Sequence, residues 1–195
     1  MRVAKNGAKR PYRLGKRAEN QRETRQRIVE AAVDLHSTLG PARTTVKQIA
    51  ERARVQRHTY YAHFPDERGL FLACSGLALE RDPLPDVESW RSLPPGRERL
   101  QRGLAELYGW FDRNAEQAAC VLRDAEHHAL TREIVELRMM PTFAGAARVL
   151  GEGLSPRGQA LLRVALDFAC WRALRDAHDV EGAADLMSVA VCGVG

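Results

Sequence analysis

Apolar side chains recur every three or four residues along most of this chain, which is the spacing of one buried face on an α-helix. The first such stripe predicts a helix from about Arg22 to Leu39, ended by Gly40 and Pro41. Its apolar members are Ile28, Ala31, Ala32, Leu35 and Leu39. No alternating strand pattern of useful length appears, so the chain is predicted to be all-α.

Similar stripes continue to the C-terminus. They predict helices over about 65–79, 97–114, 115–127, 131–151, 156–177 and from 180 onward. Pro141 lies inside the fourth of these and is expected to kink it, because proline removes a hydrogen bond to the carbonyl of Leu137. Four prolines between Asp82 and Gly96 predict a loop there.

The stretch from Thr44 to Phe64 carries two shorter patterns separated by a tight turn. In the first, apolar residues fall at i, i+3, i+4 and i+7, and two threonines precede them as candidate caps: Val46, Ile49, Ala50 and Ala53 after Thr44 and Thr45. A second short helix is predicted at about 57–61. The small Ala50 allows two helices to cross, and Val55 fills the corner behind the turn. Together they indicate a helix-turn-helix.

The residues of this motif resemble the DNA-binding domain of the TetR family of bacterial repressors. The matching positions are Thr45-Val46, Ile49-Ala50, Ala53, Val55, Thr59, Tyr61 and His63-Phe64, with Arg27-Ile28, Ala31-Ala32, Leu35 and Gly40 in the preceding helix. The resemblance covers roughly 25–71. It implies a three-helix DNA-binding domain (21–66) and a helical ligand-binding and dimerisation body (67–195). The residues ahead of them (1–20) are polar, basic and nearly without pattern, so a disordered arm is expected there. An ordinary helical hairpin would leave Arg57, His58 and Tyr61 on one exposed face without a reason.

Three positions depart from the family pattern. Arg54 stands in the turn where glycine is usual, so a non-glycine residue is expected at positive φ. Gln56 replaces the usual Ser or Thr at the start of the second helix and is a poorer cap. Glu67 stands where a lysine often binds phosphate, which leaves Arg68 as the candidate for that contact.

The resemblance also implies which side chains face DNA. Phosphate contacts are expected from Thr44, Thr45, Lys47, Tyr61, His63 and Arg68, and base contacts from Gln56, Arg57 and His58. The chemistry agrees, because arginine pairs with guanine and glutamine with adenine in the major groove.

Charge is distributed unevenly along the chain. Residues 1–68 contain 16 Lys or Arg against 7 Asp or Glu, whereas the remainder contains 14 against 18. This favours a DNA-facing N-terminal part and a body that does not meet a polyanion. The arm itself is either a solvated tail or a segment that follows phosphates beside the helix-turn-helix.

The last two predicted helices are apolar around much of their circumference, so one face needs a partner. The family builds a dimer from these helices, and a homodimer is therefore expected; burial within the monomer is the alternative. If the resemblance extends to mechanism, the body holds a ligand pocket. Its candidate residues are Tyr108, Trp110, Phe111, Met139, Met140, Phe143, Phe168 and Trp171, although such residues also form plain cores.

Other kinds of chemistry find little support. Cys74, Cys120, Cys170 and Cys192 lie far apart among apolar neighbours, which indicates buried, reduced thiols and a cytoplasmic protein rather than a zinc site. The chain has no apolar run long enough to suggest a membrane helix.

The only compact set of possible ligands or acid–base groups is Glu126, His127 and His128. Neighbouring residues on a helix point about 100° apart, so these three cannot all face one site. We expect no metal, no cofactor and no catalytic residue.

The sequence is thus interpreted as a ligand-responsive transcriptional regulator. It is expected to act as a repressor that binds double-stranded DNA at a palindromic operator as a dimer, and to be released by an unidentified small molecule. Two alternatives remain open. One is a sequence-indifferent DNA-binding protein that uses its basic arm, and the other is a helical enzyme with a site near His127.

Overall fold

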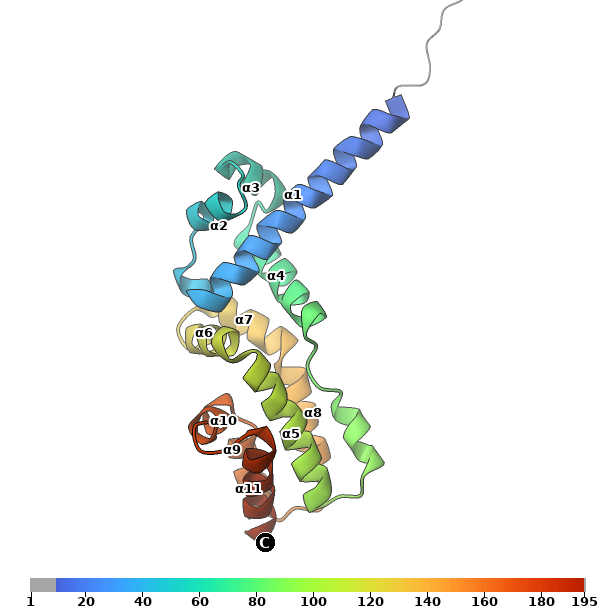
Figure 1. The fold of residues 1–195 in the computed structure, drawn as a ribbon, viewed down its shortest axis with the longest axis vertical. Helices are drawn as coiled ribbons and strands as arrows, with labels where there is room; N and C mark the ends of the chain where they lie inside the picture. The colour runs from blue at the N-terminus through green and yellow to red at the C-terminus, as the bar shows by residue number, and fades with distance from the viewer. Residues whose placement is uncertain (1–9, 195) are drawn as a thin grey trace, which may run out of the picture.

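The computed structural model describes residues 10–194, and every regular element in that range is helical, as predicted. The molecule is elongated, with α1–α4 at one end and α5–α11 at the other (Figure 1). The elements are α1 (Arg10–Thr38), η1 (Pro41–Arg43), α2 (Val46–Arg52), α3 (Arg57–His63), α4 (Glu67–Arg81), η2 (Val87–Ser92), α5 (Arg97–Arg113), α6 (Ala115–Ala125), α7 (Ala129–Arg138), α8 (Met140–Leu150), α9 (Pro156–Ala165), α10 (Phe168–Leu174) and α11 (Val180–Gly193). Within this range no helix is both long and apolar enough to span a membrane.

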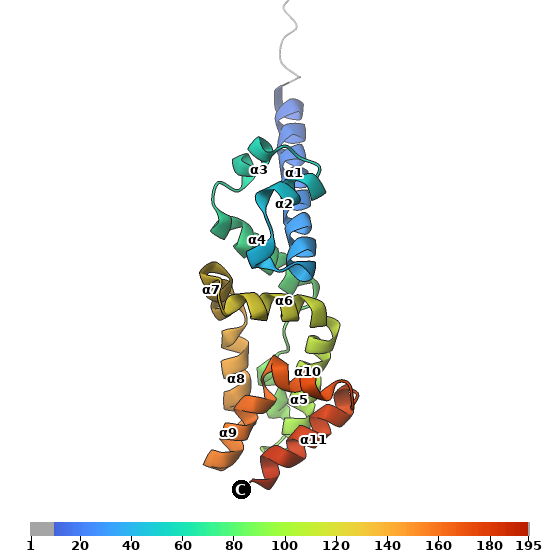
Figure 2. The ribbon, with the colours of Figure 1, turned by 90° about the vertical axis from the view of Figure 1, so that its left-hand side faces the viewer.

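Helices α1–α4 share a small apolar core of their own. Its buried members include Ile28, Ala32, Ile49, Tyr60, Phe64 and Leu70, which come from all four helices. Two ion pairs bind the outside of the bundle to α1: Arg52 to Asp34 at 2.8 Å, and Arg81 to Glu30 at 3.3 Å. Helix α3 therefore packs against the core of the bundle, beside α2 and α1 (Figure 2).

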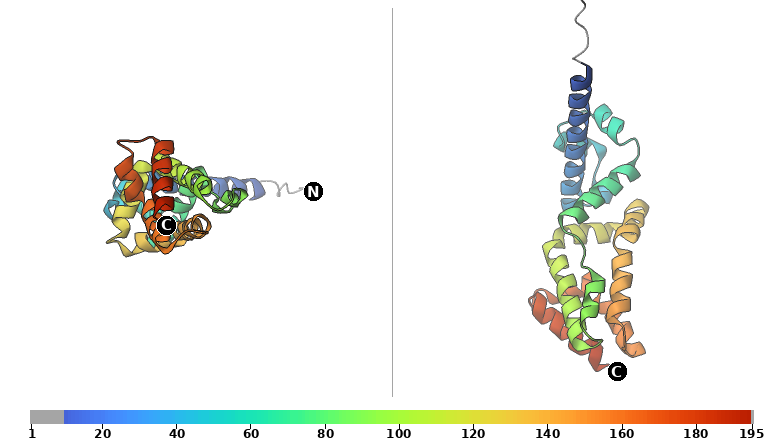
Figure 3. Two further views of the ribbon diagram at one scale, coloured as in Figure 1. Left: turned by 90° about the horizontal axis from the view of Figure 1, so that it is seen from below. Right: turned by 90° about the vertical axis from the view of Figure 1, so that its right-hand side faces the viewer.

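The body is organised around α5, whose apolar stripe is completely enclosed. Leu100, Leu104 and Phe111 have no exposed surface. Helix α11 packs along α5, and η2 places Trp90 against it, with the indole N–H donating to Glu106 at 2.7 Å. The C-terminal helices lie at the end of the molecule farthest from the start of α1 (Figure 3).

Helix α1 is longer than the sequence pattern predicted. It begins at Arg10 instead of Arg22, so the expectation of disorder is wrong for residues 10–20; the first nine residues of the expected arm lie outside the described range. The segment contains three Arg together with Leu14, Lys16, Ala18 and Glu19, which favour helix even without an apolar face. Pro11 lies in the first turn, where proline is tolerated. The start of α1 extends beyond the rest of the bundle (Figure 1).

Three details of the predicted body also differ. Pro141 ends one helix and starts another instead of kinking a single one, because proline suits the first turn of α8. The helix predicted over 156–177 is divided at Asp167, whose carboxylate accepts from the amide of Ala169 at 2.7 Å and caps α10. The proline-rich loop contains the short helix η2.

Candidate DNA-binding surface and body cavity

The start of α2 is fixed by a reciprocal capping box. The hydroxyl of Thr45 accepts from the amide of Gln48 at 3.3 Å, and the side-chain oxygen of Gln48 accepts from the amide of Thr45 at 2.8 Å. This arrangement satisfies two backbone donors that the first turn would otherwise leave free. The threonine cap expected from the sequence is confirmed.

The turn between α2 and α3 is closed by a hydrogen bond from the amide of Val55 to the carbonyl of Ala50 at 2.9 Å. Arg54 adopts a φ of 55°, and it is the only non-glycine residue at positive φ among residues 10–194. The strained backbone expected at this position is confirmed. Gln56 begins α3 without a side-chain cap, which agrees with its poor capping chemistry.

Helix α3 has one buried and one exposed side. Tyr60 is 2% exposed and Phe64 is equally buried, whereas Tyr61 is 52% exposed. Burial raises the pKa of Tyr60 to about 12, with smaller contributions from Glu67, Tyr61, Cys74 and Asp66. At the N-terminal end of the helix Gln56, Arg57 and His58 are all exposed, and within residues 10–194 Arg57 forms no ion pair. The structure therefore gathers the three candidate base readers at the exposed start of α3.

The candidate phosphate contacts are less uniform. Lys47 is exposed beside Glu51 at 3.9 Å, and His63 is half-buried. The hydroxyl of Thr44 donates to the carbonyl of Gly40 at 2.8 Å. Arg68 donates from Nε to Glu133 of α7 at 2.7 Å, so it joins the N-terminal bundle to the body. This bond competes with any phosphate contact by Arg68.

One residue near this surface was not anticipated. The guanidinium of Arg25, on α1, lies 4.8 Å from the ring centre of Phe64 at the end of α3. A stacked cation of this kind fixes the position of the charge and of the helix end. Nothing in the local sequence pattern indicates the contact, because it joins two helices that are far apart in the chain.

The bundle and the body are also joined at the end of α1. Asp124 of α6 is 1% exposed and accepts from the amide of Ala42 at 2.9 Å and from Arg123 at 2.9 Å. Burial opposes its ionisation, but the amide and the guanidinium lower the pKa of this carboxyl below its usual value. Gly40, at φ 94°, allows the close approach, because a Cβ there would lie 2.3 Å from the Asp124 carboxylate.

The set of Glu126, His127 and His128 does not converge on one point. His127 is exposed and lies 4.0 Å from Asp124, while His128 caps α7 by accepting from the amide of Thr131 at 3.3 Å. In residues 10–194 no three His, Cys, Asp or Glu side chains are grouped as metal ligands. The four cysteines carry free thiols, but only Cys74 is buried and Cys192 is exposed, so the expectation of four buried thiols is wrong.

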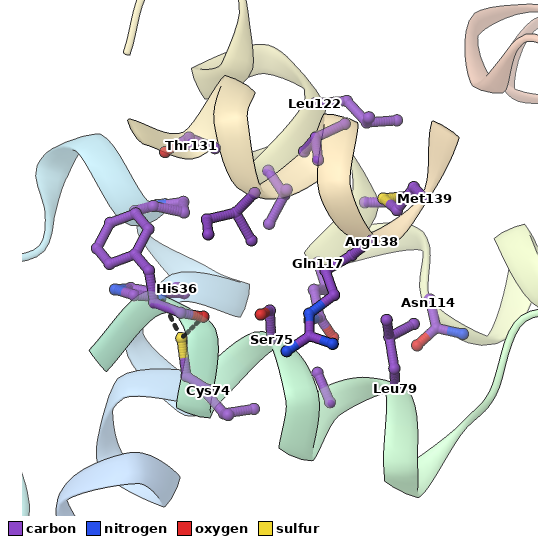
Figure 4. A pocket seen from close by; sticks show the side chains of 18 of the residues that line it. His36, Cys74, Ser75, Leu79, Asn114, Gln117, Leu122, Thr131, Arg138 and Met139 are labelled. Carbon is purple, nitrogen blue, oxygen red and sulfur yellow. Dashed lines mark hydrogen bonds between the residues drawn. The ribbon is translucent and has the colours of Figure 1, made fainter. Parts of the chain in front are cut away.

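A cavity of about 90 Å³ lies where the bundle meets the body (Figure 4). It is lined from α1 and α4 on one side and from α5, α6 and α7 on the other. His36 and Cys74 form part of the wall, with Nδ1 and Sγ 3.5 Å apart. Burial lowers the pKa of His36 to about 4, with Asp124 opposing and His128 assisting, and burial raises the pKa of Cys74 to about 12. Both side chains are therefore neutral at physiological pH.

The predicted pocket residues are divided among three places. Trp110 and Met139 line the 90 Å³ cavity. Met139 also joins Met140, Phe143 and Phe168 in an open groove of about 750 Å³ between α6, α8 and α10. The remaining three are buried in the body core and line neither space: Tyr108, Phe111 and Trp171. Sequence reasoning did not identify the wall contributed by α1, α4 and α7, including Arg138.

The two last long helices, α9 and α11, pack together and expose apolar side chains. Gly158 of α9 allows close packing, because a Cβ there would lie 3.1 Å from the Val191 carbonyl of α11. On their outer sides Val164, Leu186 and Val189 are 54%, 43% and 46% exposed. Exposed large apolar side chains on neighbouring helices suit a surface that meets another protein.

Comparison with known proteins finds similarity mainly in the N-terminal bundle. The model of the family described as bacterial regulatory proteins, tetR family, matches residues 28–74. The chain is 34% identical over 82 residues to the HTH-type transcriptional repressor KstR of Rhodococcus jostii, covering 42% of this chain and 36% of that protein. It is 36% identical over 84 residues to TtgW of Pseudomonas putida, an uncharacterized HTH-type transcriptional regulator, covering 40% and 63% respectively.

Thus the matches span less than two thirds of either curated relative. The fold extends further than the sequence similarity. A TetR-like transcriptional regulator from a Rhodococcus species superposes with a TM-score of 0.59 at 23% identity, covering 86% of this chain and 93% of that structure. At this level of identity the likeness concerns the fold alone.

Proposed function

We propose that the chain is a DNA-binding transcriptional regulator of the TetR family. The match of residues 28–74 to the family model and the similarity to a curated repressor support this proposal. The observation that carries the proposal is the two-sided character of α3. Tyr60 and Phe64 hold the helix on the bundle, while Gln56, Arg57 and His58 remain exposed at its N-terminal end. A helix held in this way can enter the major groove with its first residues against base edges.

We propose that the protein binds DNA as a homodimer formed by α9 and α11. Support comes from the exposed apolar side chains of these helices, which lie at the end of the body far from α3 (Figure 2). Two-fold symmetry would then place two copies of α3 in successive major grooves, about 34–36 Å apart. The operator would be palindromic for the same reason.

The basic start of α1 is proposed to add phosphate contacts. Residues 1–27 contain ten Lys or Arg against two Glu. The logarithm of the binding constant falls linearly with the logarithm of the salt concentration, and each neutralised phosphate makes this slope steeper by about 0.9. If each subunit gains two or three contacts, deletion of residues 1–20 lowers the slope of the dimer by about 4 to 5 units. Parallel log–log plots for the full and shortened chains would show that the segment makes no such contact.

We further propose that a small molecule binding in the body releases the protein from DNA, which makes it a repressor. Support comes from the position of the 90 Å³ cavity, whose wall includes both the bundle and the body. A ligand that fits one arrangement of these two parts better than another would shift their equilibrium by its difference in affinity. A reducing cytoplasm suits the four free thiols.

The proposal is tested by operator selection from random DNA followed by a matched pair of variants. Arg57→Ala is expected to relax base preference at one position per half-site and to cost about 1–3 kcal/mol there. Lys47→Ala removes an exposed charge from the neighbouring helix and is expected to weaken binding to all sequences alike. If no sequence is enriched, or if both variants weaken specific and random DNA equally, the protein binds DNA without reading its sequence.

A further inference from the structure

We propose that the 90 Å³ cavity binds a small carboxylic acid and that Arg138 pairs with its carboxylate. The inference rests on the proposed function, because it names the chemical class of the molecule that the body would bind. It depends on the position and surroundings of one arginine on the last turn of α7.

Arg138 enters the cavity with most of its donors unused. Its Nε is buried and has no hydrogen-bond partner among the described residues, and within them its side chain forms one hydrogen bond, from Nη2 to the carbonyl of Leu72 on α4 at 3.3 Å. No ion pair involves Arg138 anywhere in residues 10–194. A buried donor without a partner costs free energy, so the site is incomplete as it stands.

Arg99, a buried arginine in the same body, shows what a completed site looks like. Arg99 donates to the carbonyl of Leu93 at 2.7 Å, to that of Val149 at 3.2 Å and to Glu152 at 2.6 Å. Its guanidinium is therefore neutralised, and each of its three nitrogens donates to a partner inside the protein. Arg138 has the same chemistry but lacks a carboxylate, and the cavity lies where that carboxylate would be (Figure 4).

The charges of the residues that line the cavity favour a negatively charged ligand. Among the described residues that line the cavity, Arg138 is the only one with a formal charge, because His36 and Cys74 are both neutral near pH 7. No wall carboxylate competes for the guanidinium. Carboxylates pair with arginine through two parallel bonds, and a single positive charge matches a singly charged acid better than a phosphate dianion.

The other lining residues favour a ligand with a small apolar part. It is dominated by hydrocarbon side chains, which include Leu79, Val121, Leu122, Ile134 and Val135. An engineered cavity of about 150 Å³ holds benzene, so about 90 Å³ accommodates roughly four non-hydrogen atoms, with more room toward the open side. A short aliphatic acid meets both requirements, with its carboxylate on Arg138 and its chain among these residues.

The first test is direct binding to the intact protein by calorimetry. The probes are acetate, butyrate, hexanoate and decanoate, each compared with the alcohol of the same chain length. We expect butyrate or hexanoate to bind most tightly and the alcohols to bind roughly 10- to 100-fold more weakly, which is the loss expected for a hydrogen-bonded charge. Alcohols that bind as tightly as the acids would overturn the proposal.

A variant pair then assigns the carboxylate contact. Arg138→Gln is expected to weaken binding of the acid roughly 10- to 100-fold and to leave the melting temperature of the free protein unchanged or higher. Arg102→Gln, on an exposed site of α5 outside the cavity and the proposed dimer interface, changes the net charge equally and should bind the acid as the parent does. Equal affinity in Arg138→Gln and the parent overturns the assignment. If that variant does not fold, the comparison of acids with alcohols decides.

Operator binding measured on the same samples separates this inference from the function on which it rests. Failure of every acid to bind, with operator binding intact, refutes the ligand class and leaves the DNA-binding function standing. Binding of an acid that depends on Arg138, in a protein that selects no operator, supports the site and refutes the regulator.

Discussion

The N-terminal bundle and the body use the same helical packing to build opposite kinds of surface. In the bundle apolar side chains fill the core, and the polar residues at the start of α3 are exposed to solvent. In the body a charged side chain, Arg138, faces inward to a space that the protein leaves open. A partner of the bundle therefore meets the surface, whereas a ligand of the body must enter the fold.

Adjacent tyrosines on α3 give the largest contrast between inside and outside. Tyr60→Ala is expected to destabilise the bundle by about 3–5 kcal/mol, because it removes a ring that is 2% exposed. Tyr61→Ala removes a ring that is 52% exposed and is expected to change stability by less than about 0.5 kcal/mol. Urea unfolding followed by circular dichroism measures both changes.

The same pair distinguishes folding from binding. Tyr61→Ala should weaken operator affinity while the melting curve stays in place, whereas Tyr60→Ala should lower both together. Similar stability losses in the two variants would mean that α3 does not have a buried and an exposed side.

The joint between the two regions is expected to respond to acid through His36. Its pKa is about 4 when folded and 6.5 when free, because burial opposes the charged form. Between these values the unfolded chain binds more protons, so stability falls as the pH falls through this window. The full loss is about 3 kcal/mol at and below pH 4. It is measured by urea unfolding across the pH range.

The neutral variant His36→Gln serves as the control for that titration. It should be less stable near pH 7, because it disturbs a packed wall, but it should lose less stability between pH 6.5 and 4. An identical slope in the variant would assign the acid response to other groups, such as the nearby Asp124 and His128.

A smaller effect is expected at the exposed apolar face of the body. Leu186→Glu, on α11, places a charge among side chains that we propose to be covered by a second copy, and should weaken self-association roughly 100-fold. Leu137→Glu is the matched control, because Leu137 is 51% exposed on α7, away from α9 and α11. Sedimentation at several concentrations compares them. Equal association in both variants would place the interface elsewhere.

The bundle was predictable because its signals are local. The cap at Thr45 follows from residues within one turn of it, and the positive φ at Arg54 follows from the glycine that the family usually has in this turn. The alternation of buried and exposed tyrosines follows from helical periodicity. The helical start of α1 could not be predicted, because a polar segment can be helical without an apolar stripe and its composition also suits a disordered arm.

The cavity could not be predicted in the same way. Tyr108 and Trp110 belong to the same helix, yet only Trp110 reaches the cavity while Tyr108 donates to the carbonyl of Ala165 at 2.8 Å in the core. Which aromatic residue lines a space depends on helices that are distant in sequence. Arg138 was missed for the same reason, since nothing near it in the chain shows that carboxylates are absent around it.

The smallest expected effect concerns the turn that orients α3. Arg54 adopts φ 55°, a region that costs an ordinary residue about 1–2 kcal/mol and glycine almost nothing. Arg54→Gly relieves this strain but increases the freedom of the unfolded chain, so the net gain is about 0–1 kcal/mol. Arg54→Asn should lie between the two, because asparagine tolerates this conformation. Arg54→Val should be destabilised by about 1 kcal/mol, since a branched side chain fits it poorly. Urea unfolding of the four proteins should therefore rank Gly first and Val last. Because Arg54 is exposed and contributes no core contact, equal stability of the valine and glycine variants would show that the turn changes its backbone conformation at little cost. In that case α3 would be oriented by Tyr60 and Phe64 alone.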